Sequence, residues 1–143
     1  MLKVVLDTNQ FVSALLSPRG TPAQVLQAWR ERAYVLVISR ALQREIERVL
    51  TYPKIRTTYR LESRKIADLM ELIKREAVVV ADPAPVDVIT ADPSDNEAIA
   101  VAAAARADYI ISGDQHLLAL RRYRNIAIVT ATKFLQSILH RYA

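Results

Sequence analysis

The chain has 143 residues, a length that fits one domain and falls short of two. Hydrophobic residues make up 52% and charged residues 24% of it, a balance typical of globular proteins that excludes a disordered chain. The sequence contains no cysteine, which excludes a disulfide scaffold, a thiolate zinc site and a cysteine nucleophile. The net charge of +5 favours an acidic partner, such as a nucleic acid.

The hydropathy pattern indicates neither a membrane span nor a secretory leader. The longest apolar run, 98–105, is far below the roughly 20 residues of a membrane helix. The apolar stretch at the N-terminus stops at Asp7 and is too short for a signal peptide. We therefore expect a soluble, cytoplasmic protein with no membrane partner.

Short β-branched runs alternate with amphipathic stretches along the whole chain. The predicted order is strand 3–6, helix 9–16, helix 21–33, strand 34–38, helix 40–50, helix 61–76, strand 77–80, loop 82–94, helix 95–106, strand 109–112, helix 115–122, strand 126–129 and helix 133–141. Thr21, Ser39 and Thr132 are the predicted N-caps of three of these helices. Helix 95–106 is apolar nearly all round, so we expect it to be central.

This alternation predicts one α/β domain over residues 1–143. Strands that alternate with helices form right-handed βαβ units, which give a parallel sheet with helices on both faces. The prediction is a three-layer fold with five parallel strands. In such a sheet, ligands bind at the carboxyl ends of the strands.

Acidic residues gather at that predicted edge. Asp7 follows the first strand, Asp114 follows the fourth, and Asp95 opens the helix between them. Helical periodicity of 100° per residue places Glu45 on the core-facing side of helix 40–50, where a carboxylate is costly unless it is paired or bound to a metal. The same periodicity places Glu97 on the opposite side of its helix from Asp95.

Four converging carboxylates favour an oxygen-ligand metal site. They raise one another's pKa values, and a hard cation such as Mg²⁺ or Mn²⁺ removes that conflict. Asn9 and Ser112 offer an amide and a hydroxyl that hold a carboxylate or a metal-bound water. Simpler interpretations stay open: each of the three aspartates precedes a helix and suits an N-cap, and Glu45 suits an ion pair with an arginine.

Four segments together resemble PIN-domain nucleases. The first is Leu6-Asp7-Thr8-Asn9 after the opening strand, and the second is 38–54, which contains Glu45. The third is Asp92-Pro93-Ser94-Asp95-Asn96 before the Ala-rich helix, and the fourth is 107–118, which contains Ser112 and Asp114. The resemblance spans residue 2 to about residue 135 and is closest to VapC-like toxins of toxin–antitoxin pairs.

The resemblance implies a Mg²⁺- or Mn²⁺-dependent ribonuclease with a five-stranded parallel sheet. It assigns the catalytic and metal-binding roles to Asp7, Glu45, Asp95 and Asp114, with Ser112 as a polar helper and Asp92 or Asn96 sharing the work of Asp95. It also implies a homodimer and a cognate antitoxin. The apolar residues of helix 61–76 then serve either the dimer interface or the core; they are Ile66, Leu69, Met70 and Ile73.

The resulting hypothesis is hydrolysis of an RNA phosphodiester by a metal-activated water. Asp7 is the central ligand, Asp95 and Asp114 complete the coordination, and Glu45 binds metal or orients the water. Arg19, Arg40, Arg44 and Lys54 are the candidate phosphate contacts. The alternatives are a non-catalytic or partner-masked binding domain, and an Asp-nucleophile phosphatase or receiver domain. The phosphatase usually needs a second aspartate where this chain has Asn9.

Overall fold

The computed structural model describes residues 1–89 and 93–141. Its strands are β1 (Lys3–Leu6), β2 (Val35–Ser39), β3 (Val78–Val80), β4 (Tyr109–Ile111), β5 (Arg122–Tyr123) and β6 (Ile126–Val129). Its α-helices are α1 (Thr8–Leu16), α2 (Thr21–Arg30), α3 (Arg40–Leu50), α4 (Pro53–Tyr59), α5 (Ser63–Glu76), α6 (Pro93–Ala105), α7 (Gln115–Leu120) and α8 (Ala131–Lys133). A π-helical turn, Phe134–Ile138, and a 3₁₀ turn, Leu139–Arg141, continue α8.

The strands form one sheet in the order β3-β2-β1-β4-β6-β5. All neighbouring pairs are parallel except β5 and β6, which are antiparallel. In the centre, Leu6 of β1 pairs with Ile111 of β4, which in turn pairs with Val129 of β6. The three central strands therefore end level with one another, so the residues that follow them lie at one edge.

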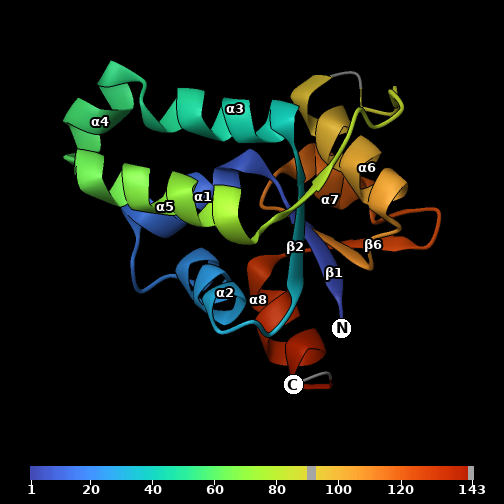
Figure 1. The fold of residues 1–143 in the computed structure, drawn as a ribbon. Helices are drawn as coiled ribbons and strands as arrows, with labels where there is room; N and C mark the ends of the chain where they lie inside the picture. Colours follow the sequence, from blue (N-terminus) through green and yellow to red (C-terminus); the bar gives the residue numbers. More distant parts are fainter. Residues whose placement is uncertain (90–92, 142–143) are drawn as a thin grey trace.

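Helices cover both faces of the sheet, as predicted. Helices α1, α2, α5 and α8 lie on one side of it, and α6 and α7 lie on the other (Figure 1). Right-handed crossovers require this arrangement, because the chain moves outward from β1 to β3 and then returns through α6 to β4. Helix α6 is buried along most of its length against β1, β2 and β4.

Two predictions about the sheet and its connections are wrong. The sheet has six strands because residues 122–123 form a short antiparallel edge strand beside β6. Residues 53–59 form α4, which has no buried residue and hence no apolar face for periodicity to detect. The helix predicted over 61–76 accordingly begins later, at Ser63.

The predicted caps are partly wrong. Ser39 caps α3 as expected, since its side chain accepts a hydrogen bond from the backbone N–H of Leu42. The N-cap of α2 is Gly20, and Thr21 with Pro22 forms the first turn. The C-terminal helix begins earlier than predicted, because Thr130 caps it in place of Thr132.

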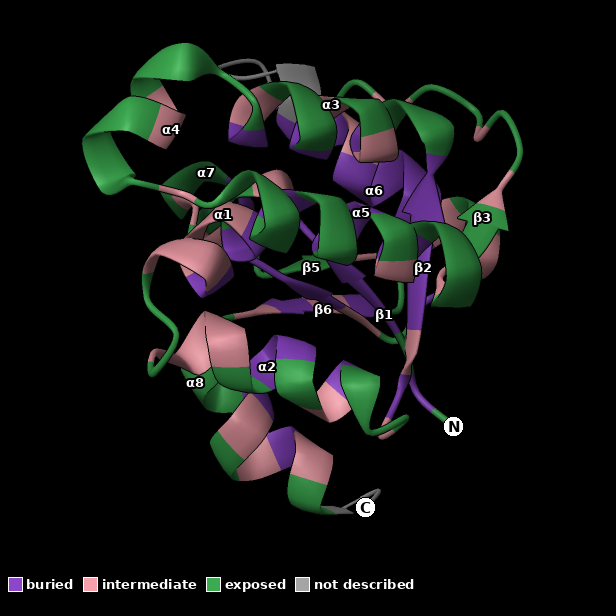
Figure 2. Cartoon of the chain, turned by 60° about the vertical axis from the view of Figure 1, so that its left-hand side comes forward, coloured by how far each residue is buried: buried purple, intermediate pink, exposed green. Residues whose placement is uncertain are grey.

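The apolar side of α5 belongs to the core of the single chain. Its four residues Ile66, Leu69, Met70 and Ile73 are all buried. Figure 2 shows β1, β2 and α6 largely buried, and the edge strand β3 and the outer sides of α3, α4 and α5 exposed. Trp29 and Tyr34 are also buried, and the Tyr34 hydroxyl donates to the carbonyl of Val25 at 2.8 Å.

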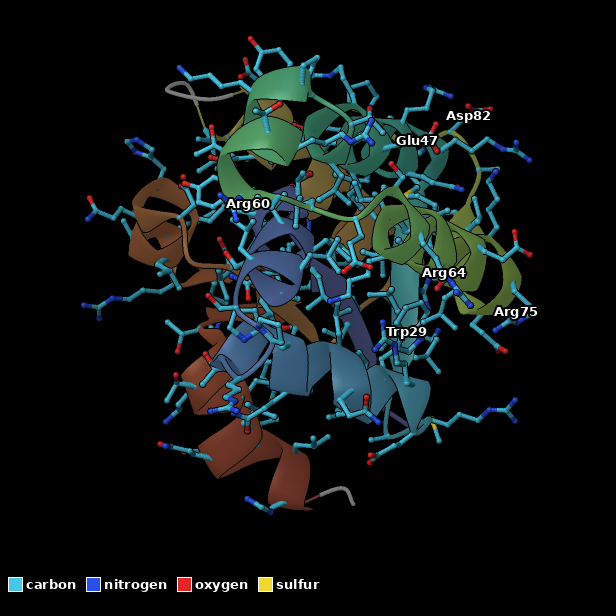
Figure 3. The ribbon with its side chains drawn as sticks, turned by 90° about the vertical axis from the view of Figure 1, so that its left-hand side faces the viewer. Trp29, Glu47, Arg60, Arg64, Arg75 and Asp82 are labelled. Carbon is cyan, nitrogen blue, oxygen red and sulfur yellow. The ribbon has the colours of Figure 1, made fainter. Side chains whose placement is uncertain are left out.

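The outer surface of the α3–α5 region is charged. Glu47 of α3 and Arg64 and Arg75 of α5 are exposed (Figure 3). Among the helices of the described residues, none combines the length and hydropathy needed to cross a bilayer.

Candidate active site

Asp7 lies where β1 ends and α1 begins. Its backbone N–H donates to the carbonyl of Ile111 at 3.1 Å, which extends the β1–β4 ladder by one residue. Its side chain then caps α1, because Oδ1 accepts from the backbone N–H of Gln10 at 3.2 Å. The residue is only 5% exposed, so this carboxylate is held inside the protein.

Ser112 ties Asp7 to the loop after β4. Its fully buried hydroxyl donates to Oδ2 of Asp7 and accepts from the backbone N–H of Asp114 at 2.9 Å. Both carboxylate oxygens of Asp7 are therefore hydrogen-bonded. From the sequence, Ser112 was expected to support Asp114. In the structure its hydroxyl links Asp7 and Asp114.

Burial makes the negative charge of Asp7 unfavourable. Desolvation raises the pKa of Asp7 to about 6 from its ordinary value of 3.8, and repulsion from Asp114 adds to the rise. Hydrogen bonds from Ser112 and from the backbone of Gln10 and Asn9 oppose that rise in pKa. A cation placed beside Asp7 would therefore stabilise its ionised form.

Asp114 is half-buried and caps α7. Its Oδ1 accepts from the backbone N–H groups of His116 at 2.8 Å and Leu117 at 3.2 Å. Among the described residues both capping bonds use Oδ1, which leaves Oδ2 available to a ligand. The N-cap interpretation is thus correct for Asp7 and Asp114, and both still share one electrostatic site.

The other two predicted acids lie on neighbouring helices. Asp95 is in the first turn of α6 and is buried, and α6 packs against β1 and β4. Glu45 is half-buried on α3, which packs against α1 and α6. Within residues 1–89 and 93–141, no three acidic or histidine side chains come together closely enough to hold one metal ion. The structure therefore joins Asp7 with Asp114 and does not join Glu45 or Asp95 to them in one cluster.

The pair fits a magnesium-type cation. Mg²⁺ keeps several of its waters and is usually bound by one or two carboxylates together with substrate phosphates. Asp7 and Asp114 provide two oxygen ligands, and the raised pKa of Asp7 shows that its charge lacks compensation. A two-carboxylate site with oxygen donors alone suits Mg²⁺ or Mn²⁺ better than a thiolate or imidazole metal.

The supporting residues differ in what they do. Asn9 is exposed at the start of α1. Asn96 is buried, and its carboxamide binds the backbone of Val88 and Ile89 through three hydrogen bonds of 2.7–2.9 Å. Its side chain thus anchors the segment before α6, a different role from the predicted sharing of the work of Asp95. Asp92 lies outside the described residues.

Glu97, predicted on the opposite side of α6 from Asp95, does not face solvent. Its side chain is half-buried, and Oε1 accepts a hydrogen bond from Ser39 at 2.8 Å. Since Ser39 also caps α3, Glu97 connects α6, which carries Asp95, to α3, which carries Glu45. Helix α6 is buried on almost every side, so a residue opposite Asp95 also meets protein.

Gln10 is the residue that the sequence reasoning missed. It is 6% exposed, and its Oε1 has no hydrogen-bond partner within the described residues. It lines a pocket of about 420 Å³ together with Asn9 and Ser13 of α1 and residues 113–116. The signal was available in the sequence, because Gln10 stands four residues before Ala14 and so shares the inward side of α1.

The candidate phosphate contacts and the histidines lie at the surface. Arg19, Arg40, Arg44 and Lys54 are exposed, as are His116 and His140. Arg40 and Arg44 are on α3 with Glu45, whereas Arg19 is in the α1–α2 loop. Their roles remain predictions.

Comparison with known proteins agrees with this geometry. The family model described as PIN domain matches residues 3–116, a range that contains Asp7, Glu45, Asp95 and Asp114. The chain is also similar to the uncharacterized protein MJ1680 of Methanocaldococcus jannaschii, with 34% identity over 120 residues that cover 84% of this chain and 76% of the relative. PIN domains are generally nucleases that use divalent metals. A model match over most of the chain, a mostly parallel α/β sheet and acids at its carboxyl edge show that this chain belongs to the PIN domain family.

Proposed function

We propose that the protein is a metal-dependent ribonuclease that hydrolyses RNA phosphodiester bonds at the carboxyl edge of its sheet. The observation that carries the proposal is the pair of Asp7 and Asp114. Ser112 links the two residues, and burial and mutual repulsion disfavour the negative charge of Asp7. A PIN domain with this pair intact is expected to bind Mg²⁺ or Mn²⁺ and to act on a nucleic acid.

Each acidic residue has a role in this proposal. Asp7 and Asp114 would hold the cation, Asp95 would complete its coordination, and Glu45 would bind metal or orient the attacking water. A bound cation supplies a water of lowered pKa and a Lewis acid for the non-bridging phosphate oxygens. Ser112 keeps the Asp7 carboxylate in one orientation, and the burial of Asp7 excludes bulk water from its oxygens.

The same geometry argues against an Asp-nucleophile phosphatase. A nucleophilic carboxylate must be reached directly by a phosphorus atom. The side chain of Asp7 is buried, which hinders the approach of a phosphoryl group to its oxygens. Asn9 also occupies the position where such enzymes usually carry a second aspartate.

The decisive experiment compares RNA cleavage by the wild type and by Asp7→Asn with Mg²⁺, with Mn²⁺ and with EDTA. Loss of a residue that only orients a metal ligand costs about 10–100-fold, so loss of Asp7 should cost at least about 100-fold. Asp108→Asn is the matched control, because Asp108 is exposed and binds the backbone N–H of Lys3 at 2.8 Å, at the opposite edge of the sheet.

Equal cleavage by wild type and Asp7→Asn would overturn this site assignment. Cleavage that persists in EDTA would overturn the metal requirement. A stable aspartyl-phosphate after incubation with a phosphodonor would favour the phosphatase. Folded, metal-binding protein that cleaves no RNA in a diverse pool would favour the binding-domain alternative.

The biological role that follows is the toxin of a toxin–antitoxin pair, acting as a homodimer. The support is the likeness of the four motif segments to VapC-like toxins. Induced expression should arrest growth with the wild type and not with Asp7→Asn, and light scattering should give twice the mass of one chain. Growth unaffected by the active enzyme would overturn the toxin role, and a monomer at high concentration would overturn the dimer.

A further inference from the structure

A polar pocket borders the two acids on the side of α1 and α7. Its walls are Asn9, Gln10 and Ser13 of α1 and residues 113–116, which include Asp114 itself. Its volume of about 420 Å³ falls within the range of roughly 300–1,000 Å³ of small-molecule sites. Any group bound there lies directly beside the proposed reaction centre.

Gln10 is the unusual residue of this pocket. It is 6% exposed, and its Oε1 is buried without a hydrogen-bond partner within the described residues. Leaving a buried polar atom unsatisfied costs about 1–3 kcal/mol. Nothing in the packing of α1 explains this, because an apolar residue beside Phe11 and Ala14 would fill the same space at no such cost.

The carboxamide of Gln10 lies next to Gly113. A Cβ built at Gly113 would stand 3.4 Å from Nε2 of Gln10, at the short end of ordinary van der Waals contact. Gly113 lies between Ser112 and Asp114, so the carboxamide sits against the loop that carries the second acid. Rotation about the last side-chain torsion exchanges donor and acceptor, so Gln10 can present either atom.

The chemistry of the walls selects the neutral part of a nucleotide. Among the described residues they contain amides, a hydroxyl, an imidazole and the carboxylate of Asp114, and no lysine or arginine that would hold a phosphate. The carboxamide atom that faces the pocket, Nε2 or after rotation Oε1, pairs with a single acceptor or donor on a nucleobase edge, such as N7 or N6 of adenine. The exposed imidazole of His116 offers a face on which an unstacked base rests.

We propose that this pocket binds the base of the nucleotide next to the scissile phosphate, and that the Gln10 carboxamide reads its hydrogen-bonding edge. The inference rests on the proposed ribonuclease function and adds the residue that reads the base beside the cut. Only an unpaired base is free to leave its stack and enter a pocket beside the reaction centre. Gln10 thereby determines which base flanks the cut.

The test uses Gln10→Leu and Gln10→Glu. Leucine removes both polar atoms at similar size, and glutamate keeps an acceptor while losing the donor. Cleavage sites are mapped on an RNA pool with every base at each position. A single hydrogen bond discriminates by roughly 2- to 13-fold, so Gln10→Leu should flatten the base preference beside the cut by that factor. Gln10→Glu should shift the preference toward bases that present a donor.

A binding measurement separates this inference from the proposed function. In the Asp7→Asn background, the affinity for short single-stranded RNA is compared with that for the same RNA carrying an abasic nucleotide. Binding should weaken with the abasic RNA when Gln10 is present, and the difference should vanish with Gln10→Leu. Gln27→Leu, the same change at an exposed position of α2, is the control.

Three results are decisive. If the wild type cleaves and Gln10→Leu keeps its base preference, the pocket assignment is wrong. If the wild type does not cleave but binding depends on the base through Gln10, the nuclease proposal fails and the pocket stands. A large loss of thermal stability in Gln10→Leu would show a structural role, whereas the proposal expects equal or higher stability.

Discussion

The two edges of the parallel sheet carry aspartates in opposite circumstances. At the carboxyl edge, Asp7 is buried, and its pKa is raised to about 6. At the amino edge, Asp108 is exposed, and it exchanges two hydrogen bonds of 2.8 Å with the backbone of Lys3. The first carboxylate opposes folding when it ionises, and the second secures the start of β1 and β4.

From this difference we propose that Asp7 serves ligand binding and that Asp108 serves the fold. A residue selected for stability alone satisfies its hydrogen bonds and stays solvated. A carboxylate that is desolvated beside a second carboxylate lowers the stability of the fold, but it can bind a ligand. Functional sites commonly contain such destabilising groups. Variants at both edges therefore test the interpretation.

The largest expected effect on stability is the pH dependence caused by Asp7. In EDTA, the folded protein keeps the Asp7 proton up to about pH 6, whereas the unfolded chain releases it near pH 3.8. This contribution is present below pH 3.8 and is lost as the pH rises through 6. The free energy of unfolding should fall by up to about 3 kcal/mol from this group over that window.

Urea unfolding at several pH values measures that change. Asp7→Asn should remove this part of the decrease and be more stable than the wild type at pH 7. Asp108→Asn should follow the wild-type pH curve. An Asp7→Asn protein less stable than the wild type at pH 7 would contradict the desolvation argument.

Ser112→Ala should give the next largest effect. The change removes the hydroxyl that donates to Asp7 and accepts from the N–H of Asp114. Since that bond favours the ionised carboxylate, its loss raises the pKa of Asp7 further and should lower cleavage about 10–100-fold at neutral pH. The pH–rate profile should also move toward higher pH. Ser63→Ala, at an exposed position of α5, is the control, and an unmoved profile would refute the role of Ser112.

Glu97→Ala should produce a smaller loss. It removes the acceptor of the Ser39 hydroxyl and loosens the connection between α6 and α3. We expect about 1 kcal/mol less stability and about 10-fold lower kcat with KM nearly unchanged. Glu97→Gln keeps an acceptor and should recover most of both. Glu47→Ala on the exposed side of α3 is the control, and equal behaviour of all three variants would exclude a positioning role.

The fold could be predicted where local signals agree. Ser39 and the periodicity after it predicted α3 with its observed bounds, and the apolar run 126–129 predicted β6. The missed elements, α4 and β5, lack such signals, because α4 buries nothing and β5 has two residues. The two residues of β5 are extended because they pair with β6, and this pairing depends on the fold as a whole.

The candidate site was predictable to the same degree. The rule that parallel strands end at one edge brought Asp7 and Asp114 together correctly. Spacing alone could not assign partners, so Asn96 was placed with the acids although it binds the backbone of Val88 and Ile89. Periodicity could have placed Gln10 on the inward side of α1, but neither its unpaired Oε1 nor the Ser39 partner of Glu97 is readable from the sequence, because both depend on what faces these residues across the interior.

The smallest expected effect is at the amino edge, where α6 ends. Arg106 has a left-handed backbone with φ of 54°, and Ala107 N–H closes the helix by donating to Ala102 at 2.9 Å. Glycine adopts that conformation without steric strain, although it loses more freedom on folding. Arg106→Gly should therefore raise the free energy of unfolding by about 0.5–1 kcal/mol.

The control is Arg44→Gly, in the middle of α3, which should lower the free energy of unfolding by about 1 kcal/mol. Urea unfolding distinguishes the two, and cleavage by Arg106→Gly should equal that of the wild type, because nothing at this edge belongs to the site. A loss of activity without a loss of stability would show that the two edges are coupled.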